Sequence, residues 1–285
     1  SVLHRTVALK LLSAESSSAD LAARLMQEAV VLARLEHPGI VPVHDAGILP
    51  DGRTFYCMKY VEGQRFDLHI KNLSLRQRLQ LLQRIAEPLA FAHSRGIIHR
   101  DLKPSNIMMG AFGEVLVMDW GLAKVMAASS ASGEVPTEDS SSRHQSGQFS
   151  IDKSYSVTTA HGTVLGTPGF MAPEQERGDV KLIDQRTDVF GLGSILQYMI
   201  HNESASRPLQ GICHKAMAAE MSVRYPSVAE LAGDVGKYLD GMPVSAYREN
   251  IIERTARLIS RNRVAVVLVL AYLLMRILFI LFSRR

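Results

Sequence analysis

One run of the sequence, His99-Arg100-Asp101-Leu102-Lys103-Pro104-Ser105-Asn106, constrains this chain more than any other. Thirteen residues after the run come Asp119, Trp120 and Gly121. Within 23 residues the chain therefore carries a candidate general base, a cation and two candidate oxygen ligands for a metal ion. Phosphoryl transfer needs this set of groups, because its catalysis consists mostly of positioning and charge neutralisation. The run therefore predicts a phosphoryl-transfer site.

This run resembles the catalytic loop of protein kinases, and Asp119-Trp120-Gly121 resembles their metal-binding loop with Trp in place of the usual Phe. The resemblance implies that Asp101 is the catalytic base, which accepts the proton of the substrate hydroxyl. It implies that Lys103 neutralises charge on the transferred group, and that Asn106 and Asp119 are Mg²⁺ ligands. Lys103 followed by Pro104 is more similar to serine/threonine kinases than to tyrosine kinases.

Residues earlier in the chain extend the resemblance to the nucleotide site. Lys10 ends a predicted strand and matches the lysine that holds the α- and β-phosphates of ATP. Glu28, 18 residues later in a predicted helix, matches the ion-pair partner of that lysine. The stretch Met58–Gly63 resembles the gatekeeper and hinge, whose backbone groups at Lys59 and Val61 would bind adenine. Without the rest of the resemblance, an ordinary edge strand explains this stretch equally well.

A third group of residues is expected to hold the site without taking part in the chemistry. The stretch 166–174 resembles the end of a kinase activation segment, and Thr167 would lie near the base and the acceptor hydroxyl. Glu174 would pair with Arg224, and Asp188 would tether the backbone of the catalytic loop. These roles also follow from the resemblance.

The activation segment itself is expected to carry a flexible insert at about residues 127–160. Ser, Thr, Gly and Gln dominate there and large apolar residues are sparse, which is typical of a segment without a core. Arg100 resembles the arginine that meets a phosphate on this segment. We therefore expect autophosphorylation at Thr158, Thr159 or Thr163, for which a homodimer is one arrangement.

Apolar periodicity predicts the elements around these motifs. Ser74 and Gln77 form a capping box that opens a long helix ending at Gly96. Helices are also predicted at Leu21–Leu35, Val189–Ile200 and Val228–Tyr238, and strands at Val2–Lys10, Ile40–Val43, Thr54–Val61, Ile97–Ile98 and Val115–Met118. The expected fold class is α+β: a bilobal, protein-kinase-like catalytic domain at 1–245, with a small, mostly-β N-lobe at about 1–62 and a helical C-lobe at about 63–245.

The charge of the chain is unevenly distributed. From Arg248 onward there are eight Arg against two Glu, whereas the whole chain has a net charge of only +4. A basic tail favours a membrane surface and argues against a nucleic-acid partner. The only cysteines, Cys57 and Cys213, lie far apart, which indicates a reducing compartment without a disulfide framework.

The end of the chain predicts a membrane anchor. Residues 264–282 are apolar except for Arg276 and the amphipathic Tyr272, a length that can span a bilayer. The segment 246–263 is a basic juxtamembrane stretch, so we expect a single-pass inner-membrane protein whose kinase domain faces the cytoplasm. A hydrophobic core helix is the alternative.

The resemblance covers about residues 2–240 and departs from the family in two respects. The stretch Ile200–Ile212 is short where the family usually places further helices, which form part of the platform for protein substrates. No Gly-rich loop precedes Val7, so we expect further sequence upstream of Ser1. The chain is identified as a member of the bacterial membrane-anchored serine/threonine kinases. This implies transfer of the γ-phosphate of ATP, with Mg²⁺, to Ser or Thr hydroxyls of protein substrates. The alternative is a membrane-tethered pseudokinase or scaffold that binds partners without efficient phosphoryl transfer.

Overall fold

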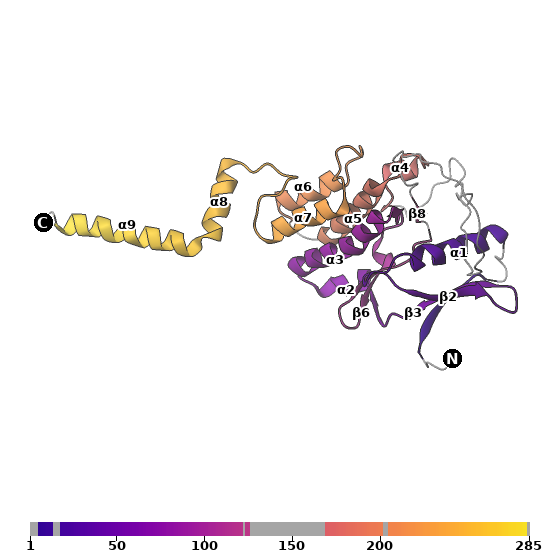
Figure 1. Ribbon diagram of the computed structural model, residues 1–285. Coiled ribbons are helices and arrows are strands. Elements are labelled where there is room, and N and C mark those ends of the chain that lie inside the picture. The colour runs from indigo at the N-terminus through magenta and orange to yellow at the C-terminus, as the bar shows by residue number, and fades with distance from the viewer. Residues whose placement is uncertain (1–4, 14–17, 122, 126–168, 202–204, 284–285) are drawn as a thin grey trace, which may run out of the picture.

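The structure is a computed structural model that describes residues 5–13, 18–121, 123–125, 169–201 and 205–283 (Figure 1). The predicted insert at about 127–160 lies outside these residues. Thr158, Thr159, Thr163 and Thr167 also lie outside them. The predicted phosphorylation sites therefore stay predictions.

The small lobe is a three-stranded antiparallel sheet covered by one helix. The strand order is β1-β3-β2, with β1 at Val7–Leu11, β2 at Val43–Ile48 and β3 at Thr54–Lys59. Helix α1, Ala19–Ala33, is capped by Ser18 and buries one apolar face. This face packs on the sheet (Figure 1), so the glutamate of the helix lies beside the central strand.

The strand predicted at Ile40–Val43 is wrong in its bounds. Ile40 makes only an isolated bridge to Val117, and β2 begins later, at Val43. The reason is Pro42, which has no N–H to give to a ladder and therefore stands before the strand. Its carbonyl oxygen accepts a hydrogen bond from the Lys59 amide at 3.1 Å.

A second small sheet, in the order β4-β6-β7, joins the hinge to the catalytic loop. Its strands are β4 (Gly63–Arg65), β6 (Ile107–Gly110) and β7 (Val115–Val117). At Gly63 a Cβ atom would collide with the carbonyl oxygen of Met109, so only glycine fits where β4 crosses β6. This close approach ties the end of the hinge to the strand that follows the catalytic loop.

The large lobe is built around two long helices. Helix α3, Leu75–Ser94, begins at the predicted capping box, in which Gln77 N–H donates to Ser74 Oγ and Gln77 Oε1 accepts from the Ser74 amide. Helix α5, Gln185–Ile200, is buried on almost every side. Helices α6 (Arg207–Ala216) and α7 (Val228–Leu239) pack against it. Short elements complete the lobe: α2 (Phe66–His69), η2 (Ile70–Asn72), β5 (Ile97–Ile98), η3 (Pro104–Asn106), β8 (Lys124–Val125) and α4 (Pro173–Glu176).

Two C-terminal helices, α8 (Ile251–Arg261) and α9 (Arg263–Ser283), lead away from the lobes (Figure 1). Helix α9 coincides with the predicted span at 264–282. In the part of the chain that the structure describes, however, no helix meets the length and apolarity that a membrane crossing requires. The structure thus gives the predicted transmembrane helix no support.

Candidate functional site

One buried carboxylate on α5 accepts hydrogen bonds from the backbone of the catalytic loop. Asp188 accepts the backbone N–H groups of His99 and Arg100, both at 2.8 Å. Its Oδ2 also lies 2.7 Å from His93 Nε2. These bonds hold Arg100 at a φ of 70°, a left-handed conformation that a non-glycine residue adopts only under constraint. Burial alone would raise the pKa of Asp188, but its bond to His93 and the nearby charges lower it.

Asp101, the predicted base, lies in a compact polar cluster. Its Oδ2 accepts hydrogen bonds from Lys103 Nζ at 2.7 Å and from Asn106 Nδ2 at 3.1 Å. The same Asn106 nitrogen donates to the Asp101 carbonyl oxygen at 2.9 Å. Asp101 is only 8% exposed, so these donors both orient its carboxylate and compensate for its lost hydration.

Two hydrogen bonds at Met118 join the segment that carries Asp119 to the segment 99–106. Its N–H donates to the Asn106 carbonyl at 2.8 Å, and its own carbonyl lies 2.9 Å from His99 Nε2. Trp120 is 1% exposed, packs edge-on against the His99 ring at 4.7 Å and donates to the Val117 carbonyl. The tryptophan therefore fills its position with a buried ring.

The predicted ion pair between the strand lysine and the helix glutamate is present. Lys10 Nζ lies 2.8 Å from Glu28 Oε1 and 3.1 Å from Asp119 Oδ1. Burial alone would lower the pKa of Lys10, but the two carboxylates raise it, so the ammonium stays charged. The structure thus brings Lys10, Glu28 and Asp119 together, and Met118 links this group to the cluster around Asp101.

Asp119 has a φ of 60°, the second left-handed non-glycine residue of the site. Gly121 follows where a Cβ atom would lie 3.1 Å from Glu28 Oε2, which leaves little room for a side chain. The side chain of Asp119 is 48% exposed, so its carboxylate can bind a cation from solvent.

The oxygen donors present suit Mg²⁺, which binds through few carboxylates together with phosphate oxygens and water. Asn106 uses its Nδ2 on Asp101, which turns its Oδ1 away as a candidate ligand. Asp119 supplies a second oxygen donor. Within the described ranges, no group of three or more His, Cys, Asp or Glu side chains is placed to hold a metal ion.

The hinge residues lie apart from the charged groups. Lys59 ends β3 and its amide donates to Pro42, so of its two backbone groups the carbonyl is the candidate for adenine. Val61 is half-buried in the segment between β3 and β4. Their adenine-binding roles stay predictions.

Glu174 and Arg224 form an ion pair away from the charged groups of the site. Two parallel hydrogen bonds of 2.8 Å join the guanidinium to the carboxylate, and both side chains are fully buried. Burial alone would raise the pKa of Glu174, but Arg224 lowers it. Such a bidentate pair fixes the segment after the activation loop against the helical lobe.

Sequence patterns missed two residues that join these parts. Tyr56 on β3 donates its hydroxyl hydrogen to Glu28 Oε1 at 2.8 Å. Gln175 donates to the Arg100 carbonyl at 2.7 Å. Neither belongs to a local motif, because each contact depends on how distant segments meet.

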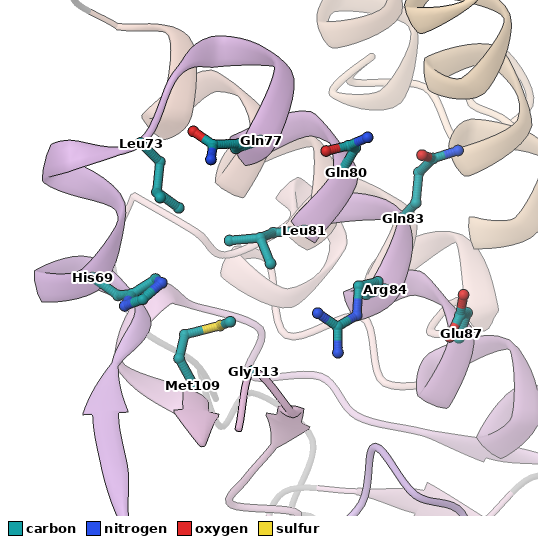
Figure 2. A pocket seen from close by; sticks show the side chains of 10 residues that line it. All are labelled: His69, Leu73, Gln77, Gln80, Leu81, Gln83, Arg84, Glu87, Met109 and Gly113. Carbon is teal, nitrogen blue, oxygen red and sulfur yellow. The ribbon is translucent and has the colours of Figure 1, made fainter. Parts of the chain in front are cut away.

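A cavity of about 600 Å³ lies elsewhere, on the helical lobe (Figure 2). Gln77, Gln80 and Arg84 line it from α3, and Met109 lines it from β6 (Figure 2). None of the predicted site residues lines this cavity, so it does not belong to the site described above.

Sequence comparison finds relatives of this chain among known proteins. The family described as "Protein kinase domain" matches residues 3–242. The serine/threonine-protein kinase PknD of Chlamydia felis is 32% identical over 291 residues, covering 85% of this chain and 29% of that protein. PknD of Protochlamydia amoebophila is 30% identical over 264 residues, covering 76% of this chain and 26% of that protein. The chain thus spans under a third of the length of these relatives.

A solved structure supports the fold. The kinase domain of Mycobacterium tuberculosis PknI, in a form with one cysteine replaced by alanine, matches with a TM-score of 0.55 and 23% sequence identity. The match covers 81% of this chain and 84% of that one. At this identity the likeness concerns the fold alone: a small β-containing lobe and a helical lobe.

Proposed function

Because this chain belongs to the protein kinase family, we propose that it is an ATP-dependent serine/threonine protein kinase. One observation carries the proposal: the residues predicted for phosphoryl transfer form two clusters joined through Met118. One cluster holds the proposed base, and the other holds the proposed phosphate-binding lysine. A scaffold that only binds partners would not need both clusters intact.

In this proposal Asp101 accepts the proton of the substrate hydroxyl. Lys103 and Asn106 orient its carboxylate, so that little reorganisation is needed when the hydroxyl arrives. Lys103 lies beside the base and is placed to neutralise charge on the transferred group. Lys10 is charged and already lies beside Asp119, so it can turn from that carboxylate to the α- and β-phosphates.

Asn106 and Asp119 are the residues that would hold Mg²⁺. When bound, the metal neutralises the charge of the phosphate oxygens. Asn106 contributes a neutral oxygen and Asp119 a charged one, and Asp188 keeps the loop that carries Asn106 in place. Lys59 and Val61 are the proposed adenine contacts, through backbone groups.

The test of this function is transfer of labelled phosphate from ATP to the protein itself and to a generic basic protein. Asp101→Asn should lower the rate by at least about a hundredfold, the usual contribution of a general base, while nucleotide affinity stays near that of the wild type. Asp67→Asn, a surface change, is the matched control. Equal transfer by the wild type and Asp101→Asn would reject the base, and no transfer by the wild type would favour the scaffold.

The same variant tests whether two copies act on each other. Wild-type protein is mixed with a size-tagged Asp101→Asn chain and labelled ATP. Label on the tagged chain would support the proposed autophosphorylation between copies in a homodimer. Label confined to the wild-type chain would reject it.

We also propose, from the sequence, that residues 246–282 hold the kinase domain at the cytoplasmic side of the inner membrane. Support comes from apolar side chains that lie exposed along α9, such as Val267, Leu274 and Phe279, and from the arginines that precede them. The test is fractionation of cells that express the chain with and without residues 263–285. Recovery of both forms in the soluble fraction would reject the proposal.

A further inference from the structure

Tyr56 lies directly across the sheet from the lysine of the site. The register of β1 and β3 pairs Lys10 with Tyr56, and Tyr56 is 2% exposed. Its hydroxyl donates to Glu28 Oε1 at 2.8 Å, and Lys10 Nζ lies 5.8 Å from the centre of its ring. Tyr56 therefore contacts both partners of the ion pair from a buried position.

Glu28 needs this contact because its charge is buried. The residue is 5% exposed, and its carboxylate accepts hydrogen bonds from Lys10 and Tyr56. Lys10 is a shared partner, since it also bonds Asp119. The tyrosine is a constant partner: burial and the nearby carboxylates raise its pKa, so its hydroxyl keeps the hydrogen that it donates.

Resting on the proposed kinase function, we propose that Tyr56 is a positioning residue that fixes Glu28 and, through it, Lys10. With Glu28 held by the hydroxyl, Lys10 can exchange Asp119 for the phosphates of ATP while its other carboxylate stays in place. Without the hydroxyl, Glu28 and helix α1 gain freedom, and Lys10 is aligned for transfer in a smaller fraction of molecules.

Tyr56→Phe removes the hydroxyl and keeps the ring that fills the core. We expect kcat to fall about tenfold, the size that loss of one hydrogen bond to a charged group produces. We expect KM for ATP to change less than about threefold, because the charge on the phosphates that Lys10 neutralises grows in the transition state. Amide hydrogen exchange around Glu28 in α1 should become several times faster.

The chain offers a matched control in Tyr225. This residue is 1% exposed and donates its hydroxyl hydrogen to the carboxylate of Asp234 at 2.9 Å, far from the site. Tyr225→Phe deletes the same group from an equally buried tyrosine. It should leave kcat and exchange in α1 unchanged, which separates positioning from a general loss of stability.

A double-mutant cycle with Glu28→Leu, which removes the acceptor of the Tyr56 hydroxyl, tests whether Tyr56 acts through Glu28. In the Glu28→Leu background, Tyr56→Phe should cause no further fall in kcat. A further tenfold fall there, an equal fall in Tyr225→Phe, or unchanged kcat and exchange in Tyr56→Phe would each overturn the proposal. If the wild type transfers no phosphate, the kinase function fails, and exchange in α1 alone still decides whether Tyr56 holds Glu28.

Discussion

The ion pair of Lys10 and Glu28 in the small lobe and the ion pair of Arg224 and Glu174 in the helical lobe use the same chemistry in opposite surroundings. In the small lobe, the side chain of Lys10 is 37% exposed and that of Glu28 only 4%. In the helical lobe, Arg224 and Glu174 are both fully buried. Lys10 divides its ammonium between two carboxylates, whereas the bonds of Arg224 go to one carboxylate and to nearby backbone carbonyls.

The choice of cation follows from this difference. Arginine has a planar fork that suits a bidentate, permanent contact, and lysine is a compact charge that can change partners. The pair in the helical lobe therefore holds a segment in place, and the pair in the small lobe can rearrange when a substrate arrives. Stability should depend on the fully buried pair of the helical lobe, and activity on the partly exposed pair of the small lobe.

Arg224→Ala should have the largest effect on stability. It leaves Glu174 buried without its cation, so the free energy of unfolding should fall by about 3–5 kcal/mol. Arg65→Ala is the matched control, because Arg65 forms an exposed pair with Asp67. That change should cost less than about 1 kcal/mol. Urea denaturation measures the free energy of unfolding of both variants. Equal losses of stability would contradict the distinction between buried and exposed ion pairs.

Protonation of Asp234 in acid should destabilise the helical lobe. We expect an effect on the free energy of unfolding smaller than that of Arg224→Ala and larger than that of Lys10→Met. Burial alone would raise the pKa of Asp234, but hydrogen bonds from Ser245, Lys237 and Tyr225 lower it from 3.8 to about 2. Because the pKa of Asp234 is lower in the folded than in the unfolded protein, its ionised carboxylate stabilises the fold at a pH above about 4. This contribution to the free energy of unfolding is lost as the pH falls from about 4 to about 2. The loss should be about 2 kcal/mol.

Denaturation curves of the wild type and Asp234→Asn across this range give the measurement. The variant should be less stable at neutral pH and should show a flatter dependence on acid. If both chains lose the same stability between pH 4 and pH 2, Asp234 does not carry the effect.

Lys10→Met should have the smallest effect on stability and a large effect on activity. Water can replace the half-exposed ammonium and Tyr56 keeps its bond to Glu28, so unfolding should become easier by only about 1 kcal/mol. Phosphate transfer should fall at least about a hundredfold, since the charge on the phosphates is no longer neutralised. Thermal melting and a transfer assay together check this. A stability loss as large as that of Arg224→Ala would remove the contrast between the lobes.

Local signals predicted most of the secondary structure. The capping box at Ser74 and Gln77 identified the start of α3, and apolar runs identified α5 and β5. The strand expected at Ile40–Val43 begins only at Val43, because Pro42 lacks a donor. The sequence reading also favoured a membrane span, which the described residues do not support.

The site was predictable where its residues are close in sequence. Asp101, Lys103 and Asn106 lie within six residues, and the structure joins them by direct hydrogen bonds. The contact of Tyr56 with Glu28 was not predictable. It depends on the register of two strands and on the depth at which α1 packs, and no local pattern encodes either.

By itself the sequence determined the kinds of groups present, since the base, the lysines and the metal-binding oxygens stand in motifs with their own spacing. It also determined where α3 and α7 begin, because caps and apolar periodicity act within a few residues. Only the tertiary structure decided which charges share a partner and which are sealed from water. The exposure and pairing of a charged side chain depend on how segments distant in sequence pack together. This packing buries Arg224 against Glu174 and leaves Lys10 between Glu28 and Asp119.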